Sequence, residues 1–233
     1  IGAIWFDGWW DKPDADWQLE RQYTLIHRLQ PGCLIGNNHH KAPFEGEDFQ
    51  MFERDLPGQN KAGYSADAEI SALPLESCET MNNTWGYNIN DRNFKSTKQL
   101  IHTLVGAAGN NANLLLNVGP RPGGDFPEGS VRHLKEIGEW MRTYGETIQG
   151  TRAGIIPQQD WGVTTQKGNK LYIHILNLNK TELLLPTTDR KIKSIVCFKD
   201  QTPVKYKKTK EGILLQLNEV PTDIDHIVEI IWK

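Results

Sequence analysis

The chain has 233 residues, of which 38% are hydrophobic and 24% are charged, a balance typical of a folded protein. Its 26 basic and 29 acidic residues give a formal net charge of -3, which offers no basic field for a nucleic-acid partner. No apolar run approaches the ~18 residues that a membrane-spanning helix needs, and three widely spaced cysteines exclude a disulfide framework.

The chain begins IGAIWFDGWW, without Met and without the basic and apolar regions of a signal peptide. It opens directly in what reads as a buried strand, so we expect it to start in the middle of a fold. Over the first 150 residues, strand patterns then alternate with helix patterns. The predicted elements, in chain order, are strand Ala3–Phe6, a helix capped by Asp14 or Asp16 and stopped at 31–32, strand 33–36, a loop-rich stretch to about 93 that is partly strand-like, helix 96–109, strand 113–118 and helix 127–145.

This rhythm is typical of a parallel sheet with helices packed outside it. In such a sheet, the polar residues that follow each strand gather at one rim, where functional sites lie. Asp7, the run 37–40 and Asn117 all fall at that rim. Each of them is explained equally well as a functional group or as a simple loop cap.

After Gly150 the pattern changes to short runs that alternate apolar and polar residues, separated by turn sequences. This pattern predicts a small antiparallel β-sandwich. We therefore expect two domains, residues 1–149 and residues 150–233. The predicted strands are 170–178, 182–185, 192–198, 204–208, 213–217 and 227–232.

Tryptophan is unusually frequent, with eight in the chain and several near Asp7. A carboxylate that ends a strand between aromatic residues is either a functional acid or a turn former. Because indole faces stack on the apolar faces of sugars, the aromatic density favours a sugar pocket. The candidates for the pocket are Trp5, Trp9, Trp10, Trp17 and Trp85, although for Trp17 a place in the core is favoured.

A second carboxylate-rich stretch covers residues 45–58, and its default interpretation is a solvated acidic loop. Phe49 and Met51 make part of it strand-like, so Glu53 is expected to be partly buried. A carboxyl beside aromatic residues has a raised pKa, which suits a general acid. Together with an ionised carboxylate, it would form the two-carboxylate pair of a glycoside hydrolase.

Other chemistries find little support. His39 and His40 are adjacent, and neighbouring side chains of a strand point apart, so joint ligation of one metal is not expected. No zinc motif, phosphate-binding loop or nucleophilic serine motif is present. The sequence therefore predicts neither a catalytic metal nor a cofactor.

Several segments together resemble family 29 glycoside hydrolases, the α-L-fucosidases. The similarity extends over nearly the whole chain, and its two longest motifs are the specific ones. The segments that carry it are WFDG at 5–8, Asp48-Phe49, Glu53, DLPG at 55–58, CET at 78–80, WGYN at 85–88, NLLLNVGP at 113–120 and GEWMRTYGE at 138–146.

The resemblance implies an α/β fold, the second half of a (β/α)8-like barrel followed by a small antiparallel β-sandwich. It implies a retaining, metal-free α-L-fucosidase that hydrolyses terminal α-L-fucosyl linkages of glycans by double displacement. By position, Asp7 resembles the nucleophile and Glu53 the general acid/base, with Glu69 and Glu79 as alternatives.

The same resemblance implies the substrate contacts. Trp5 resembles an aromatic of the sugar pocket, to which the tryptophan cluster adds Trp10. His39 resembles a polar contact near the catalytic centre, and Trp85 resembles the aromatic that packs on the methyl side of fucose. The implied partner is a fucosylated glycan, with no nucleic acid and no membrane.

The family's nucleophile lies about halfway along its barrel, and the residues expected upstream of it are absent from this sequence. The chain by itself is therefore expected to be inactive. A periplasmic or secreted location is favoured, or a lysosomal one in a eukaryote. A non-catalytic glycan-binding module and a different barrel glycosidase are the alternative functions.

Overall fold

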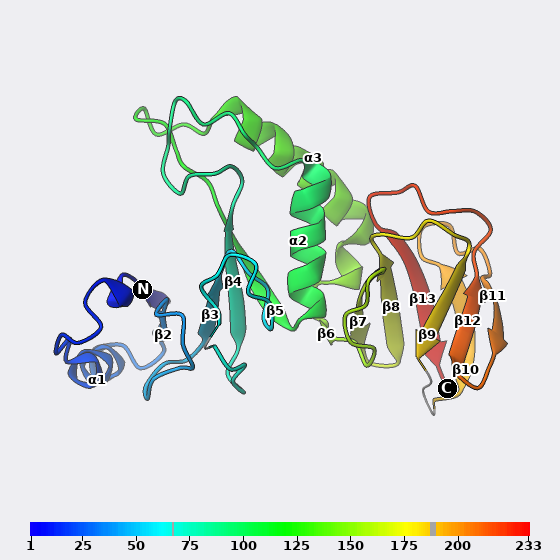
Figure 1. The fold of residues 1–233 in the computed structure, drawn as a ribbon, viewed down its shortest axis with the longest axis horizontal. Coiled ribbons are helices and arrows are strands. Elements are labelled where there is room, and N and C mark those ends of the chain that lie inside the picture. Colours follow the sequence, from blue (N-terminus) through cyan, green and yellow to red (C-terminus); the bar gives the residue numbers. More distant parts are fainter. Residues whose placement is uncertain (67, 187–189) are drawn as a thin grey trace. The chain divides into compact units, whose positions relative to one another are not determined.

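A computed structural model of the chain describes residues 1–66, 68–186 and 190–233 (Figure 1). These residues form two compact units. The first comprises Ile1–Thr80 and Ala112–Asn117, and the second comprises Met81–Asn111 and Val118–Lys233. These units follow the contacts within the structure, whereas the domain boundary expected between residues 149 and 150 follows the change in strand pattern along the sequence. That domain boundary stays a prediction.

The first unit is built on five parallel strands. The first two strands pair with each other, the last three form a sheet, and a single bridge between Gly36 and Phe49 links the two groups. The order in space therefore follows the order in the chain. The strands are β1 (Ala3–Phe6), β2 (Leu34–Asn37), β3 (Gln50–Glu53), β4 (Leu75–Thr80) and β5 (Ala112–Asn117).

The predictions for β1, β2 and β5 are confirmed within one or two residues, whereas β4 falls in the stretch expected to be loop-rich. The sequence of β4, LESCET, has no apolar run. It is held instead by neighbours on both sides, because it pairs with β3 and β5.

Helix α1 (Leu19–Leu29) contacts β1 and β2 through Tyr23, whose hydroxyl accepts from the Asn37 amide at 2.8 Å. Its buried Tyr23 lies edge-to-face on Phe6, with ring centroids 5.3 Å apart. The predicted cap was wrong: the N-cap is Gln18, in the left-handed region, and Asp16 only accepts a bond from the Gln18 amide, at 3.1 Å. Trp17 was also placed wrongly, because it is 42% exposed and its indole N–H bonds to a backbone carbonyl.

The strand register decides which side chains share the face opposite α1. Glu53 pairs with Cys78 in parallel register, and because side chains alternate along a strand, Glu76 shares their face while Glu79 lies on the other. Gly36 lies next to Phe49, and a Cβ there would come within 2.2 Å of the Phe49 ring. The close approach of β2 and β3 therefore requires a glycine at this position.

The second unit begins with two helices, α2 (Thr97–Gly109) and α3 (Glu128–Tyr144), and the short η2 (Gly145–Thr147). Ser96 caps α2 in a complete capping box with Gln99, as the sequence predicts. Side chains of both helices pack on one face of an antiparallel sheet, around the buried Trp140 and Tyr172. Every helix in the described part of the chain is too short or too polar to cross a bilayer.

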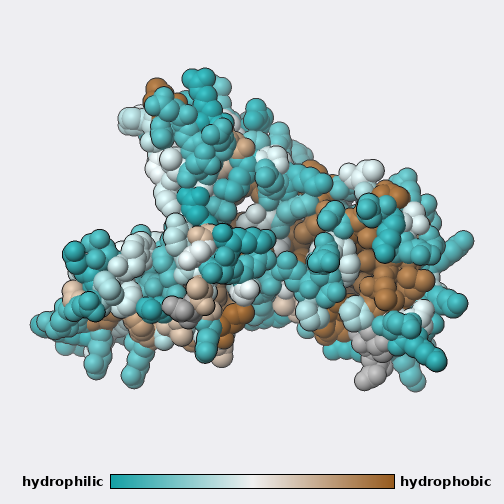
Figure 2. Space-filling view, viewed as in Figure 1, coloured by the Kyte–Doolittle hydropathy of each residue, from teal (hydrophilic) through white to brown (hydrophobic). Residues whose placement is uncertain are grey.

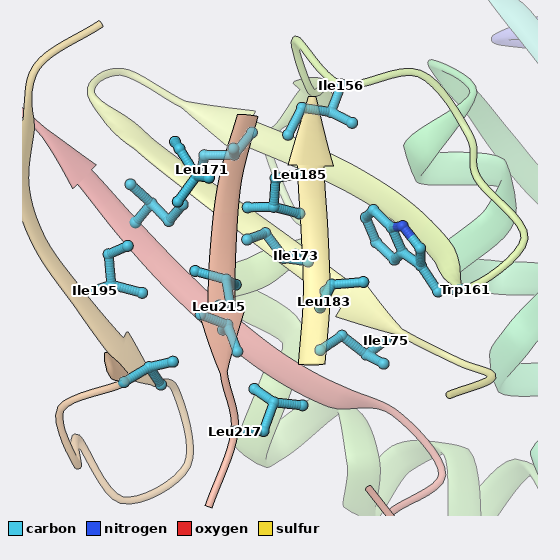
Figure 3. Packing of buried hydrophobic residues seen from close by; sticks show 14 of the residues in the cluster. Ile156, Trp161, Leu171, Ile173, Ile175, Leu183, Leu185, Ile195, Leu215 and Leu217 are labelled. Carbon is cyan, nitrogen blue, oxygen red and sulfur yellow. The ribbon is translucent and has the colours of Figure 1, made fainter. Parts of the chain in front are cut away.

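The rest of this unit is two antiparallel sheets, in agreement with the predicted β-sandwich. Branched side chains of both sheets form one core, which includes Ile173, Leu185 and Leu215, all essentially fully buried (Figure 3). The strand β7, with the sequence GVTTQK, was not predicted. The five-stranded sheet has the order β10 (Ile192–Cys197), β13 (His226–Trp232), β8 (Lys170–Ile175), β7 (Gly162–Lys167), β6 (Arg152–Ala153), and the three-stranded sheet β11 (Lys205–Lys208), β12 (Gly212–Gln216), β9 (Glu182–Pro186).

Candidate active site

Asp7 directly follows β1, at the carboxyl end of the parallel strands. Its side chain is exposed. Gly8 adopts a left-handed φ of 81°, which turns the chain into the short helix η1 (Trp9–Asp11). This turn places Trp9 and Trp10 beside the aspartate, at the rim where the sequence predicts a site.

Asn38 brings the two predicted catalytic carboxylates together. Its buried side-chain amide nitrogen donates to Asp7 Oδ1 at 3.2 Å and to Glu53 Oε2 at 2.9 Å. These two distances cap the separation of the two carboxyl oxygens at about 6 Å, within the ~5–9.5 Å over which glycosidase carboxyl pairs work. The amide has one hydrogen for each acceptor, so both bonds form at once.

His40 is the second partner of Glu53. Its Nε2 lies 3.0 Å from Glu53 Oε2, and its ring is stacked between Trp10 and Tyr64, with centroids at 4.6 and 5.0 Å. The hydrogen bond from His40 holds the pKa of Glu53 below its usual range. The expected rise of this pKa is therefore wrong, because the nearby aromatic rings lie on His40 rather than on the carboxyl.

Glu76 is a carboxylate that the sequence reasoning did not select. Burial raises its pKa, and a hydrogen bond from Trp5 offsets part of that rise. Its neighbour on the same face is Cys78, whose thiol pKa rises to about 12 through burial and through the charges of Glu53, Glu76 and Asp7. Three carboxylates therefore surround one buried, protonated thiol.

His39 points into the first unit instead of towards the rim. Its Nδ1 accepts from the Lys41 backbone N–H at 3.1 Å, so Nε2 carries the proton and donates to Glu47, also at 3.1 Å. Glu47 accepts a further bond from Tyr23, at 2.9 Å. Because both ring nitrogens are occupied and the residue is 3% exposed, a hydrogen bond from His39 to a sugar would require one of these bonds to break.

The remaining candidates are spread more widely. Trp5 and Trp10 are 38% and 44% exposed, which leaves indole surface open in the first unit, and Trp85 lies in the second unit, in the loop after β4. Glu69 is exposed in a loop. Glu79 accepts from the backbone N–H and the hydroxyl of Thr80, on the face of β4 opposite to Glu76.

Sequence reasoning missed four residues that shape this cluster. The strand-end rule pointed to the run 37–40, but it could not choose Asn38 and His40 over their neighbours. Tyr64 lies in a loop without a local signal, and Glu76 belongs to a strand that the sequence pattern does not reveal. Among the described residues, no group of three or more His, Cys, Asp or Glu side chains could hold a metal ion.

Comparison with known proteins agrees with the sequence motifs and with the fold. The family model for alpha-L-fucosidase matches residues 2–146. The chain therefore belongs to the alpha-L-fucosidase family, which is the resemblance that the sequence motifs indicate.

Individual relatives are distant and longer than this chain. A putative alpha-L-fucosidase of Caenorhabditis elegans is 27% identical over 164 residues, which are 66% of this chain and 31% of that protein. The plasma alpha-L-fucosidase of Homo sapiens is 26% identical over 159 residues, 64% of this chain and 32% of that protein. The chain thus spans about a third of the length of these curated relatives.

Among solved structures, alpha-L-fucosidase isoenzyme 1 from Paenibacillus thiaminolyticus is 31% identical, with a TM-score of 0.81, over 100% of this chain and 58% of that one. A GH29 alpha-L-fucosidase from Bacteroides thetaiotaomicron is 20% identical, with a TM-score of 0.81, over 100% of this chain and 57% of that one. The second likeness shows the fold alone.

Proposed function

We propose that this chain forms part of a retaining α-L-fucosidase that hydrolyses terminal α-L-fucosyl linkages of glycans. The five parallel strands would be the second half of a (β/α)8-like barrel, with the site at the carboxyl ends of the strands. The observation that carries the proposal is the single amide of Asn38, which holds Asp7 and Glu53 within reach of one another.

In the first step of the proposed reaction, ionised Asp7 attacks the anomeric carbon, and the bond from that carbon to the leaving oxygen breaks. Glu53 donates its proton to this oxygen, and the fucosyl group remains as an ester of Asp7. In the second step, Glu53 takes a proton from water, whose oxygen attacks the anomeric carbon and releases Asp7. Two inversions at one carbon give retention, which requires carboxyl groups ~5–5.5 Å apart.

The environment of Glu53 fits the second step directly. Its hydrogen bond from His40 favours the carboxylate, which is the form that acts as a base on water. For the first step the carboxyl must carry a proton, which the hydrogen bond from His40 disfavours and burial favours.

A relative supports the covalent step. The Bacteroides thetaiotaomicron enzyme was solved as a trapped covalent intermediate in complex with 2-fluoro-fucosyl fluoride. An ester between Asp7 and the fucosyl group is the equivalent species in this chain. Trp5 and Trp10 offer exposed indole faces for the sugar. His39 and Trp85 remain proposed contacts. Because both ring nitrogens of His39 are occupied, His39 would act on the sugar site indirectly, through the buried groups to which it is hydrogen-bonded.

Glu76 is the rival for the acid/base role. It is half-buried, its pKa is raised, and one of its oxygens has no hydrogen-bond partner among the described residues.

A fucosylated glycan is the proposed partner. The proposed compartment is periplasmic or extracellular, or lysosomal in a eukaryote, and a glycan-binding module without hydrolysis is the second candidate function.

The test measures hydrolysis of an aryl α-L-fucoside by a polypeptide in which this parallel sheet is closed into a barrel. Asp7→Ala is expected to lower kcat by about a thousandfold or more, and azide is expected to restore turnover to Asp7→Gly. Glu53→Gln should cost about 10²–10⁴-fold for a poor leaving group and much less for a good one. Parent-like turnover in Asp7→Ala would refute the nucleophile, and a leaving-group effect in Glu76→Gln instead of Glu53→Gln would transfer the acid/base role.

A further inference from the structure

A second candidate site lies wholly within the second unit, apart from the carboxylate cluster. The loop that follows β4, the loop that precedes α3 and the first turn of α3 enclose a cavity of about 480 Å³, which we call the loop cavity. Figure 1 shows these two loops beside the start of α3, and Figure 2 shows mainly hydrophilic residues over them. None of the residues that line it takes part in the proposed double displacement.

The walls of the loop cavity are held by specific contacts. Asp91 accepts from the backbone N–H groups of Asn83 and Thr84, at 2.8 and 2.9 Å, and from the Thr84 hydroxyl at 3.1 Å. The two loops meet at Gly119, where a Cβ would lie 2.6 Å from the Tyr87 backbone nitrogen. This packing means that the cavity is formed without a ligand.

Three guanidinium groups line the loop cavity, those of Arg92, Arg121 and Arg132. Arg92 forms no ion pair or side-chain hydrogen bond with any residue that the structure describes. Arg121 pairs with the exposed Asp125 at 2.8 Å, and Arg132 lies 3.3 Å from His133 Nε2 and helps to lower the pKa of Glu136. A guanidinium group without a carboxylate partner, such as that of Arg92, is available to bind an anion.

The other polar groups of the cavity leave the guanidinium of Arg92 without an ion pair among the described residues. Two carboxylates line the cavity. Asp91 accepts hydrogen bonds from its own loop, and Glu128 is exposed in the first turn of α3. The N-cap of α3 is Pro127, which has no side-chain acceptor for the backbone N–H groups of the first turn.

Apolar surface adjoins the charged groups. Tyr87, which lines the cavity, is 38% exposed, and Ile89 is 69% exposed. An exposed phenol ring can stack on the apolar face of a sugar, while guanidinium groups bind a carboxylate or a sulfate in a fork. The combination of the two suits a sugar that carries a negative charge.

We propose that the loop cavity binds an anionic group of the glycan, a sugar carboxylate or a sulfate ester, through Arg92, Arg121 and Arg132, with Tyr87 against the sugar ring. This inference rests on the proposed function, since it assigns the class of fucosylated glycan that the protein selects. The loop cavity would bind anionic glycans in preference to neutral glycans of the same size.

The test is calorimetric titration of the protein with three probes that share one fucosylated core. One probe is neutral, one carries a sulfate ester, and one carries a terminal sialic acid. The anionic probes should bind about tenfold more tightly than the neutral probe, and Arg92→Ala with Arg132→Ala should abolish this preference. Tighter binding of one anionic probe only identifies which group the cavity takes.

Arg142→Ala is the matched control, because Arg142 lies on the same helix outside the cavity and pairs with Glu139. If the double variant does not fold, the parent alone decides: added salt should weaken its binding of the anionic probes and leave the neutral probe unaffected. Equal affinity for all three probes would overturn the proposal.

The readout separates this inference from the function on which it rests. An anionic preference in a closed-barrel polypeptide that hydrolyses no fucoside would contradict the fucosidase proposal and leave the loop-cavity proposal standing. Hydrolysis of a fucoside without any preference for anionic probes would support the fucosidase proposal and contradict the loop-cavity proposal.

Discussion

At the scale of single residues, the carboxylate cluster depends on side chains that have no catalytic chemistry of their own. Asn38 joins Asp7 to Glu53, and His40 is fixed between two aromatic rings while it donates to Glu53. His40 and Arg54, which flank this glutamate, have positive φ values of 63° and 55°. Backbone strain of this kind is common where a site must be held in one geometry.

Replacement of His40 by Phe tests this arrangement, because it keeps an aromatic ring between Trp10 and Tyr64 but removes the donor. We expect the pKa of Glu53 to rise towards or above its usual value. Carbon NMR titration of the Glu53 carboxyl measures this, with His27→Phe, which removes the partner of Asp48, as the control. An unchanged titration of Glu53 in His40→Phe would show that His40 does not govern it.

The same carboxyl has a consequence for stability. Because the folded-state pKa of Glu53 is lowered, its contribution to stability is present above the unfolded-state pKa and is lost as the pH falls through the folded value. The difference in urea midpoint between the parent and Glu53→Gln should therefore shrink as the pH is lowered through that range.

At the scale of elements, much of the fold was predictable from local signals. The capping box at Ser96 and the glycines near 109 and 145 mark α2 and α3 correctly. β4 and β7 were not predicted, because LESCET and GVTTQK have no clear hydrophobic period and form strands only through neighbours on both sides. The predicted cap of α1 is wrong for a local reason, since two nearby aspartates offer the same signal and the N-cap is Gln18.

Two glycines in the second unit should respond in opposite ways to replacement by alanine. Gly138 lies inside α3, and a Cβ added there would meet nothing within 4 Å, so Gly138→Ala should stabilise the protein by about 0.5–1 kcal/mol. Gly212, at the start of β12, has a φ of +152°, and its Cβ would lie 1.9 Å from the Leu185 carbonyl oxygen. Gly212→Ala should cost about 1–3 kcal/mol. Urea unfolding measures both, and shifts of equal sign would contradict this account.

At the scale of the whole molecule, the two units differ in their hydrophobic cores. The sandwich of the second unit has a continuous core of branched side chains (Figure 3). In the first unit, Leu34 and Leu115 lie on strands and are 51% and 46% exposed. An open parallel sheet leaves such side chains without partners, whereas a closed barrel would bury one face of it.

This contrast predicts different costs for two truncations to alanine. Ile173→Ala should destabilise the protein by about 2–5 kcal/mol, because it leaves a cavity in the sandwich core. Leu115→Ala should change the free energy of unfolding by no more than about 0.5 kcal/mol, because its side chain is already half-exposed. Thermal and urea unfolding of the chain test both values, and a cost for Leu115→Ala as large as that for Ile173→Ala would show that Leu115 is buried in solution.

The sequence by itself determined the family, the change from parallel to antiparallel strands and the two candidate carboxylates Asp7 and Glu53. These features depend on local motifs and on hydrophobic period, which are properties of short segments. Only the tertiary structure decided that Asn38 bridges the carboxylates, that His39 is buried against Glu47 and that His40 holds Glu53. The contacts of Asn38 and His40 join residues from different loops or strands, whereas His39 and Glu47 lie in one loop and Tyr23 of α1 completes their network. These partners depend on strand register and helix packing, which no single segment encodes.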